Sequence, residues 1–122
     1  MKKSFHVMHV KIKRVYQQPD DQDGIRILVD RLWPRGLSEE KARVDLWLKD
    51  ISPSTELRKW FAHDPKKWVE FQRRYREELS DNAEQVSLLR KEAAKGPVTL
   101  LFGAKDEKHN QAVVLQSVLG SK

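Results

Sequence analysis

The stretch "IRILVDRLWPRG", residues 25–36, decides the fold of this chain. Its first half, 25–30, is nearly apolar on both sides, which is typical of a strand that is covered on both faces of a sheet. Arg31, Trp33 and Arg35 follow directly after it. This change predicts that the chain leaves a buried strand here and enters a site for a small anionic ligand.

The rest of the chain contains further strand and helix patterns. Residues 9–16 alternate in polarity like a strand, and residues 98–106 are apolar on both sides like a second interior strand. Segment 44–51 fits either a strand or a helix. Helices are expected after an N-cap at Ser38 and over 52–63, where a serine caps the helix and Pro53 lies in its first turn. Another helix should begin at Asp64–Pro65 and carry a stripe of large, mainly aromatic residues at Trp68, Phe71, Tyr75 and Leu79. Two more are expected over 82–94 and 109–119.

These elements predict an α/β fold with a single small domain over residues 1–122. The sheet should be short and mainly parallel, with about three to four strands and helices packed on both faces. Strands 25–30 and 98–103 should lie side by side, joined by a crossover through the helical middle of the chain. Residues 1–6 and 120–122 are expected to be loose termini.

The composition indicates a globular protein and excludes several classes. Hydrophobic residues make up 39% of the chain and charged residues 34%, and no apolar run approaches the roughly 20 residues that span a bilayer. The amino end lacks the apolar segment of a signal peptide, so we expect a cytoplasmic protein with no membrane partner. Cysteine is absent, which excludes disulfides, thiolate nucleophiles and cysteine-rich zinc sites.

The basic balance favours anionic partners without selecting one. Lys and Arg number 24 against 18 Asp and Glu, a formal charge of +6. Basic residues are interleaved with acids, as in "RRYREEL", so nucleic acid is a partner that the pattern allows but does not favour. No metal is expected, because His6 and His9 would point to opposite faces of a strand and Pro19 replaces the first ligand of a calcium-like loop at 17–24. No cofactor is expected either, since no glycine-rich phosphate loop occurs.

Polar residues follow both interior strands, and ligands of parallel α/β sheets bind at such carboxyl ends. Gly103 would let the backbone approach closely, and the amino end of the last helix would offer free N–H groups. The candidate acid–base residues are Asp30, His63, Asp106 and His109, and the candidate anion-binding cations are Arg31, Arg35 and Lys105. This set suits hydrolysis or transfer at an anionic centre, but binding alone explains the same residues, so the sequence does not decide whether the protein is an enzyme.

Each candidate also has a structural interpretation. One alternative is an ion-pair network of Asp30 and Arg31 with Lys105 and Asp106. The others are packing of Trp33 on Pro34, with a cis bond between them also allowed, helix capping by Asn110, and an ordinary loop role for His63. The aromatic stripe is assigned to the core rather than to a cofactor site, because few other large residues are available to fill a core.

Three blocks of the sequence resemble the YeaO-like group of the domain of unknown function 488 family. They are "RILVDRLWPRGL", "LKDISPSTELRKWFAHDPKKWVEFQRRYREEL" and "GPVTLLFGAKDEKHNQAVVL", and the resemblance covers residues 9–119. It implies a small bacterial single-domain α/β protein without an established activity. The motif positions are Asp30, Arg31, Trp33, Pro34, Arg35, Gly36, Ser54, Arg58, Trp60, His63, Lys105, Asp106, His109 and Asn110.

The resemblance adds Ser54 and Arg58 to the candidate site. They lie one helical turn apart and would share a face that closes over the crevice. The ligand-binding candidates are then Arg31, Trp33, Arg35, Ser54, Arg58, Lys105 and Asn110. Phe102–Gly103 stands where the family leads us to expect tyrosine followed by alanine or serine, which puts a hydroxyl role there in doubt.

The leading hypothesis is therefore a cationic site for a small phosphate- or carboxylate-bearing ligand at the strand ends, with hydrolase or transferase activity left open. The rival hypotheses are a nucleic-acid-binding protein and a protein-interaction module in which the motif is a structural polar network. The sequence indicates neither a reaction nor an oligomeric state.

Overall fold

Four parallel strands form one sheet in the computed structural model, which describes residues 9–120. The strands are β1 (Val10–Arg14), β2 (Ile25–Leu28), β3 (Leu46–Trp47) and β4 (Val98–Phe102), in the spatial order β1-β4-β2-β3. β2 and β4 are neighbours, with Ile25 opposite Val98 and Leu28 opposite Leu101. The predicted α/β fold and the parallel pairing of the two interior strands are confirmed.

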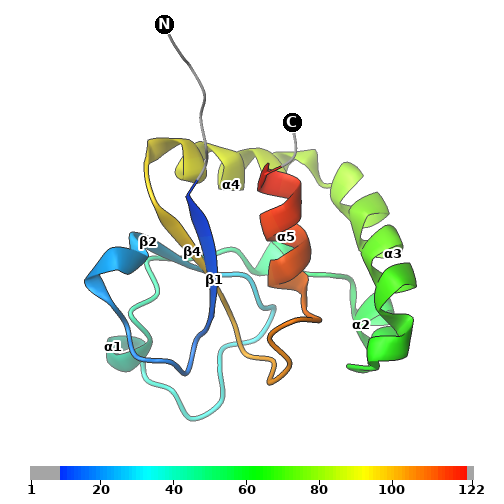
Figure 1. Ribbon diagram of the computed structural model, residues 1–122, viewed down its shortest axis with the longest axis horizontal. Helices are drawn as coiled ribbons and strands as arrows, with labels where there is room; N and C mark the ends of the chain where they lie inside the picture. Colours follow the sequence, from blue (N-terminus) through cyan, green and yellow to red (C-terminus); the bar gives the residue numbers. More distant parts are fainter. Residues whose placement is uncertain (1–8, 121–122) are drawn as a thin grey trace, which may run out of the picture.

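Helices pack on both faces of this sheet (Figure 1). They are α1 (Glu39–Ala42), α2 (Thr55–Phe61), α3 (Trp68–Ser80), α4 (Ala83–Lys95) and α5 (Gln111–Gly120), with short 3-10 turns η1 (Asp21–Asp23), η2 (Lys49–Ile51) and η3 (Pro65–Lys67). Helices α2 to α5 enclose the larger core, and α1 covers the other face. Gly120 is helical rather than loose, while His6 and the loose ends expected at 1–6 and 121–122 lie outside the described residues.

The larger core lies between the sheet and the long helices. Phe71, Tyr75 and Leu79 of α3 are buried in it together with the inward residues of β2 and β4, and Trp68 packs at its edge. The Tyr75 hydroxyl donates a 2.7 Å hydrogen bond to the carbonyl of Ile51, so its one polar atom is satisfied. Burial of each large side chain contributes about 1.5–3 kcal/mol. The assignment of the aromatic stripe to the core is confirmed.

Helix α2 begins later than the sequence predicts. Its first residue is Thr55, and Ser54, not Ser52, caps it by accepting a 3.1 Å hydrogen bond from the N–H of Leu57. The carboxylate of Glu78 on α3 accepts hydrogen bonds from the N–H and the hydroxyl of Ser54, at 2.8 and 2.6 Å. This contact fixes the cap and leaves Pro53 before the helix instead of in its first turn.

The opposite face of the sheet is covered by a small apolar cluster and two tryptophans. Segment 44–51, which fitted a strand or a helix, contains both β3 and the turn η2. Trp47 of β3 packs edge to face on Trp33, with 5.5 Å between ring centroids, and Trp33 Nε1 donates to the carbonyl of Leu37. The Trp33–Pro34 bond is trans, like every peptide bond among residues 9–120, so the interpretation with a cis Pro34 is wrong.

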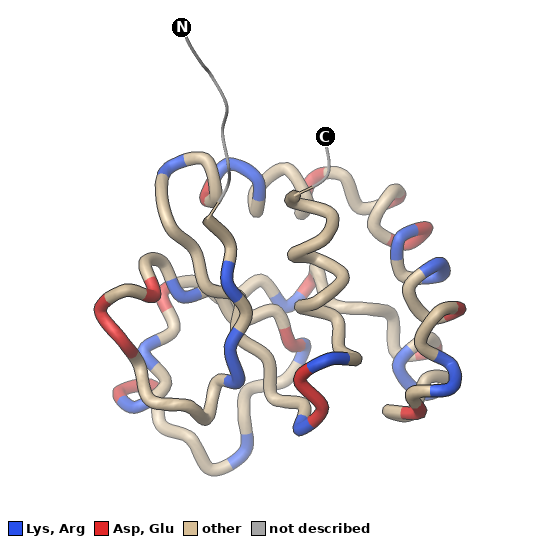
Figure 2. Tube along the Cα trace, viewed as in Figure 1, with Lys and Arg blue, Asp and Glu red and all other residues tan. Residues whose placement is uncertain are grey.

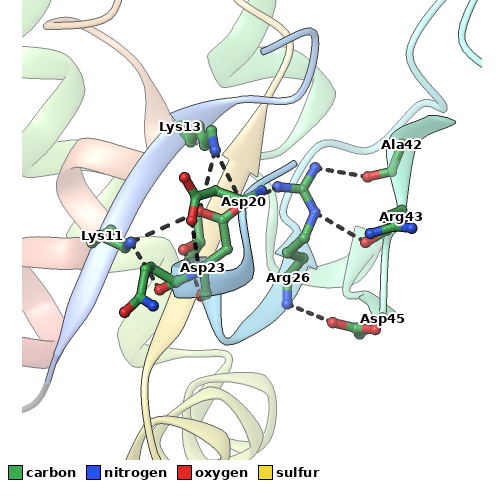
Figure 3. Close-up of polar contacts among 10 residues, drawn as sticks. Lys11, Lys13, Asp20, Asp23, Arg26, Ala42, Arg43 and Asp45 are labelled. Atoms are coloured by element: carbon green, nitrogen blue, oxygen red, sulfur yellow. Dashed lines mark hydrogen bonds and ion pairs between the residues drawn. The ribbon is translucent and has the colours of Figure 1, made fainter. Parts of the chain in front are cut away.

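A buried ion pair joins β2 to the turn before it and to α1 (Figure 3). Asp23 and Arg26 are only 2% and 4% exposed, with 2.6 Å between Asp23 Oδ2 and Arg26 Nη1. Lys13 Nζ approaches the same oxygen to 3.1 Å. Arg26 also donates to the carbonyls of Ala42 and Arg43, at 2.7 and 3.0 Å. The guanidinium therefore holds the end of α1 against the sheet.

The loop before β2 contains the short 3-10 turn η1. Asp20 and Asp23 cap it reciprocally, each side chain accepting from backbone N–H groups of the turn. Burial would raise the pKa of Asp23, but hydrogen bonds from the Asp20 N–H, Lys13 and Arg26 outweigh burial and hold the pKa below its ordinary value. The carboxylate is thus ionised and fully paired at neutral pH.

Asp23→Asn should lower the free energy of unfolding by about 3 kcal/mol, because it leaves the buried Arg26 guanidinium without its carboxylate. Equilibrium urea denaturation at neutral pH measures the change. Asp21→Asn alters an exposed carboxylate in the same turn and should change the free energy by less than about 0.5 kcal/mol. Equal effects of the two substitutions would show that the ion pair does not stabilise the fold.

Candidate functional site

A pocket of about 810 Å³ opens at the carboxyl ends of β2 and β4. The two segments that follow these strands, 30–35 and parts of 103–111, line it together with residues of α2 and the turn after that helix. The predicted convergence of the two strand ends is therefore observed. The volume falls within the roughly 300–1,000 Å³ of ordinary small-molecule sites.

Asp30 is the carboxylate of this pocket, and it is fixed by donors from the neighbouring strand end. Its Oδ2 accepts a 2.8 Å hydrogen bond from the N–H of Gly103, and its Oδ1 accepts from Gln111 Nε2. A Cβ atom at position 103 would lie 3.0 Å from Oδ2, so glycine permits this approach. Burial raises the pKa of Asp30, although these hydrogen bonds and the charges of Arg58 and His63 oppose the rise.

Cationic side chains surround the carboxylate. Arg58 and Lys59 come from the last turn of α2, and Arg35 comes from the segment after β2. All three are exposed, and their charged groups make no hydrogen bond or ion pair with residues 9–120 within the usual distance limits. The position of Arg35 is set by its backbone, since its carbonyl accepts a 2.9 Å hydrogen bond from the hydroxyl of Tyr16. These cations are free to bind a ligand.

Arg31 also lines the pocket and is weakly held. Its side chain is 35% exposed, and its ion pair with the exposed Asp50 spans 4.0 Å. Its Nε atom is buried and has no hydrogen-bond partner within residues 9–120. A buried donor without a partner costs about 1–3 kcal/mol, so the Nε atom of Arg31 lowers the stability of the fold.

His63 reaches the pocket through an unusual backbone conformation. Ala62 and His63 are consecutive non-glycine residues with positive φ, 46° and 58°. The N–H of Ala62 donates to the carbonyl of Arg58 at the end of α2, and Asp64 caps the turn η3 that follows. Left-handed conformations cost about 1–2 kcal/mol for residues with a side chain. The two helix caps hold this strained pair, which places the imidazole at the pocket wall.

The segment after β4 places His109 in the pocket and uses its other polar residues to build the turn. His109 Nδ1 lies 2.8 Å from Asp106 Oδ2, and its ring packs edge to face on Trp68 at 5.2 Å. Hydrogen bonds from His109 and the Lys108 N–H hold the pKa of Asp106 below its ordinary value. Asn110 is buried and caps α5, its Oδ1 accepting two backbone N–H groups at 2.9 and 3.2 Å. The capping interpretation of Asn110 is confirmed, and these two N–H groups are not free for a ligand.

The structure separates the predicted residues into two groups. Those that line the pocket are Asp30, Arg31, Trp33, Arg35, Arg58, His63, His109 and Asn110. Ser54, Lys105 and Asp106 lie outside the lining, since Ser54 caps α2, Asp106 contacts His109, and Lys105 is exposed. The alternative network of strand-end ion pairs is absent from residues 9–120, because Asp30 and Arg31 have other partners. The binding and acid–base roles of the lining residues stay predictions.

Several lining residues were not predicted from the sequence, among them the polar Tyr16, Lys59 and Gln111 and the apolar Leu32, Phe61 and Phe71. Lys59 directly follows Arg58 and carries the same charge, so its place beside the site could have been predicted from the sequence. Gln111 bonds to Asp30 across 81 positions of sequence, and no local pattern predicts such a contact.

Comparisons with known proteins identify relatives along almost the whole chain. A family model described as "Inactive DUF488-N3 subclade" matches residues 9–122. The uncharacterised protein YeaO of Escherichia coli K12 is 43% identical over 114 residues, which cover 93% of this chain and 99% of that protein. The uncharacterised protein Rv3073c of Mycobacterium tuberculosis H37Rv is 41% identical over 113 residues, covering 93% of this chain and 95% of that protein.

No solved structure matches the chain significantly. Within residues 9–120, no helix is long and apolar enough to cross a membrane. The same residues contain no group of three or more histidine, aspartate or glutamate side chains placed to hold a metal ion.

Arg31→Ala should leave the free energy of unfolding unchanged or raise it by up to about 1–3 kcal/mol, because within residues 9–120 its ion pair is long and its buried Nε has no partner. Arg26→Ala is the matched control and should cost about 3 kcal/mol, since it breaks a buried pair. Urea denaturation of both variants makes the comparison. A loss at Arg31 as large as that at Arg26 would mean that the arginine is part of a structural network.

Asp30→Asn should be at least as stable as the unmodified protein at neutral pH, because it removes a charge whose burial is unfavourable. The raised pKa means that this advantage disappears as the pH falls below 3.8, where the carboxyl is neutral in both the folded and the unfolded chain. Thermal melting over the acid and neutral range measures the difference.

Asp106→Asn is a control for which the expected change in stability has the opposite sign. The lowered pKa of Asp106 contributes stability at neutral pH that is lost as the pH falls through that pKa, so this variant should be the less stable one at neutral pH. An Asp30→Asn variant that is also destabilised at neutral pH would show that the fold requires the charge of Asp30.

Proposed function

Because this chain belongs to the DUF488-N3i family, described as the inactive DUF488-N3 subclade, we propose that its pocket binds a small phosphate- or carboxylate-bearing ligand without converting it. One observation carries the proposal: the pocket lining holds four arginine or lysine side chains and a single carboxylate. The cations are Arg31, Arg35, Arg58 and Lys59, and the carboxylate is Asp30.

Most of these cationic groups lack hydrogen-bond or ion-pair partners among residues 9–120, which supports ligand binding over a structural role. Arg35 and Arg58 have no hydrogen-bond or ion-pair partner for their guanidinium groups among residues 9–120, and Arg31 has a buried Nε without a partner. A guanidinium presents paired donors in one plane, which match two oxygens of a phosphate or carboxylate. An anion of this kind would satisfy groups that the protein leaves unsatisfied.

Hydrolysis or transfer is the other use of the same residues. Asp30, His63 and His109 line the pocket and are of the types that serve as general acids and bases. The description of the family as inactive counts against turnover, and we therefore favour binding. Release of inorganic phosphate from any ligand that binds would reverse this preference.

Nucleic acid is the second candidate and is supported by the formal charge of +6. In Figure 2 the basic residues are interleaved with acidic ones along the chain, and they do not gather on one element. On α3, for example, Arg73 and Arg74 pair with Glu70 at 2.7 and 2.8 Å. Cations that are neutralised by their own helix contribute little to binding a phosphate backbone, so this candidate is not favoured.

Arg58→Gln should weaken the binding of inorganic phosphate about tenfold, because a charge-assisted hydrogen bond to the anion is lost. Isothermal titration calorimetry at low salt measures the dissociation constant. A parallel thermal-shift panel of nucleotides, sugar phosphates and dicarboxylates searches for tighter ligands.

Lys91→Gln is the control for this experiment, since it removes the same formal charge from an exposed position on α4, outside the pocket. Its affinity for phosphate should equal that of the unmodified protein. Equal weakening by both substitutions would mean that phosphate responds only to net charge, and failure of every anion to bind would overturn the proposal.

A further inference from the structure

We infer that the ligand of this pocket carries, besides its anionic group, a hydrogen-bond donor on a flat apolar body, and that Asp30 accepts this donor. The inference rests on the proposed function, because it names the class of ligand that the same pocket would take. It follows from three features of the lining: a fixed carboxylate, an apolar wall that includes Leu32 and Trp33, and cations on the exposed side.

The carboxylate of Asp30 is an acceptor that the protein holds in place and does not neutralise. Gly103 and Gln111 each donate one hydrogen bond to it, so it cannot turn away from the pocket. No Lys, Arg or His nitrogen lies within ion-pair distance of it among residues 9–120. An ionised carboxylate has about four acceptor positions, and the protein occupies two of them. The remaining positions would repel a bare anion and accept an N–H or O–H group.

The pocket also offers an apolar surface beside this acceptor. Phe61 and Phe71 line it, and their rings are stacked with centroids 4.3 Å apart and an angle of 25° between planes. Both are almost completely buried, at 5% and 2% exposure, so they form the floor of the pocket and expose little ring surface. The exposed Leu32 and the half-buried Trp33, which follow Asp30 in the chain, supply the apolar surface of the pocket wall. Flat apolar groups pack favourably against aromatic rings. A volume of about 810 Å³ accommodates such a body, whereas a phosphate ion alone would leave most of it to water.

The difference in exposure among the lining residues indicates how the ligand would be oriented. Arg35, Arg58 and Lys59 are exposed, so the anionic group binds on the open side of the pocket. Asp30 is half-buried and lies beside the β4 end, so the donor points inward. The class is therefore a phosphorylated or carboxylated compound whose opposite end bears an amino, amide or hydroxyl group on a planar body.

Two matched probes test this class: phenylphosphonate and 4-aminophenylphosphonate, which differ only by a neutral donor. Calorimetry on the unmodified protein should give about tenfold tighter binding of the amino compound, because one hydrogen bond to a charged acceptor is gained. Asp30→Asn should reduce this preference to about twofold or less and should strengthen the binding of inorganic phosphate several-fold, since it removes a negative charge.

The outcomes distinguish the inference from the proposal on which it rests. If phosphate and phenylphosphonate bind but the amino group adds nothing, the inference is wrong and the anion site stands. If neither anion binds to the unmodified protein or to Asp30→Asn, both are wrong. If the preference is present and survives Asp30→Asn, the donor contacts another residue and the inference is wrong. The comparison on the unmodified protein needs no variant, so the absence of a preference overturns the inference even if Asp30→Asn fails to fold.

Discussion

The parallel register of β2 and β4 is the constraint on which the pocket depends. With Leu28 opposite Leu101, the chain just beyond each strand brings Asp30 to Gly103, and the Gly103 N–H donates to the carboxylate at 2.8 Å. A shift of one residue would place Arg26 and Leu28 on the face of the larger core in place of Ile27 and Val29, and it would break this hydrogen bond. The hydrophobic pattern that forms the core thus also positions the acceptor of the site.

Two arginines near this register have opposite roles. Arg26 is buried, pairs with Asp23 and donates to carbonyls at the end of α1, so all of its polar groups serve the fold (Figure 3). Arg31 lies five positions later, and within residues 9–120 it has one long ion pair and a buried Nε without a partner. Proteins tolerate unsatisfied groups and strained residues mainly where function requires them. Arg26 and Asp23 thus stabilise one face of the sheet, whereas the charged groups of Arg35, Arg58 and Lys59 at its carboxyl edge have no hydrogen-bond or ion-pair partner among residues 9–120.

Sequence periodicity was sufficient to predict most of the fold, because the spacing of apolar residues within each helix or strand determines which of its faces is buried. It predicted the two interior strands and the buried aromatic stripe of α3, and both are observed. The predicted start of α2 was wrong because the carboxylate of Glu78, 24 positions away, accepts hydrogen bonds from Ser54 and fixes that residue as the cap. The polar groups of Ser54 and Asp106 form hydrogen bonds in a helix cap and a turn, and Lys105 is exposed outside the pocket lining. The type of a residue alone does not predict such a placement.

The sequence by itself determined an α/β domain, its family, and the two strand ends at which polar groups would meet. Only the tertiary structure decided which of those groups line the pocket and which are used within the fold. It also supplied Gln111, whose contact with Asp30 joins the segment after β2 to α5. The physical reason is that burial patterns repeat locally along a chain, whereas a hydrogen bond depends on distances and angles between segments that only the folded chain brings together.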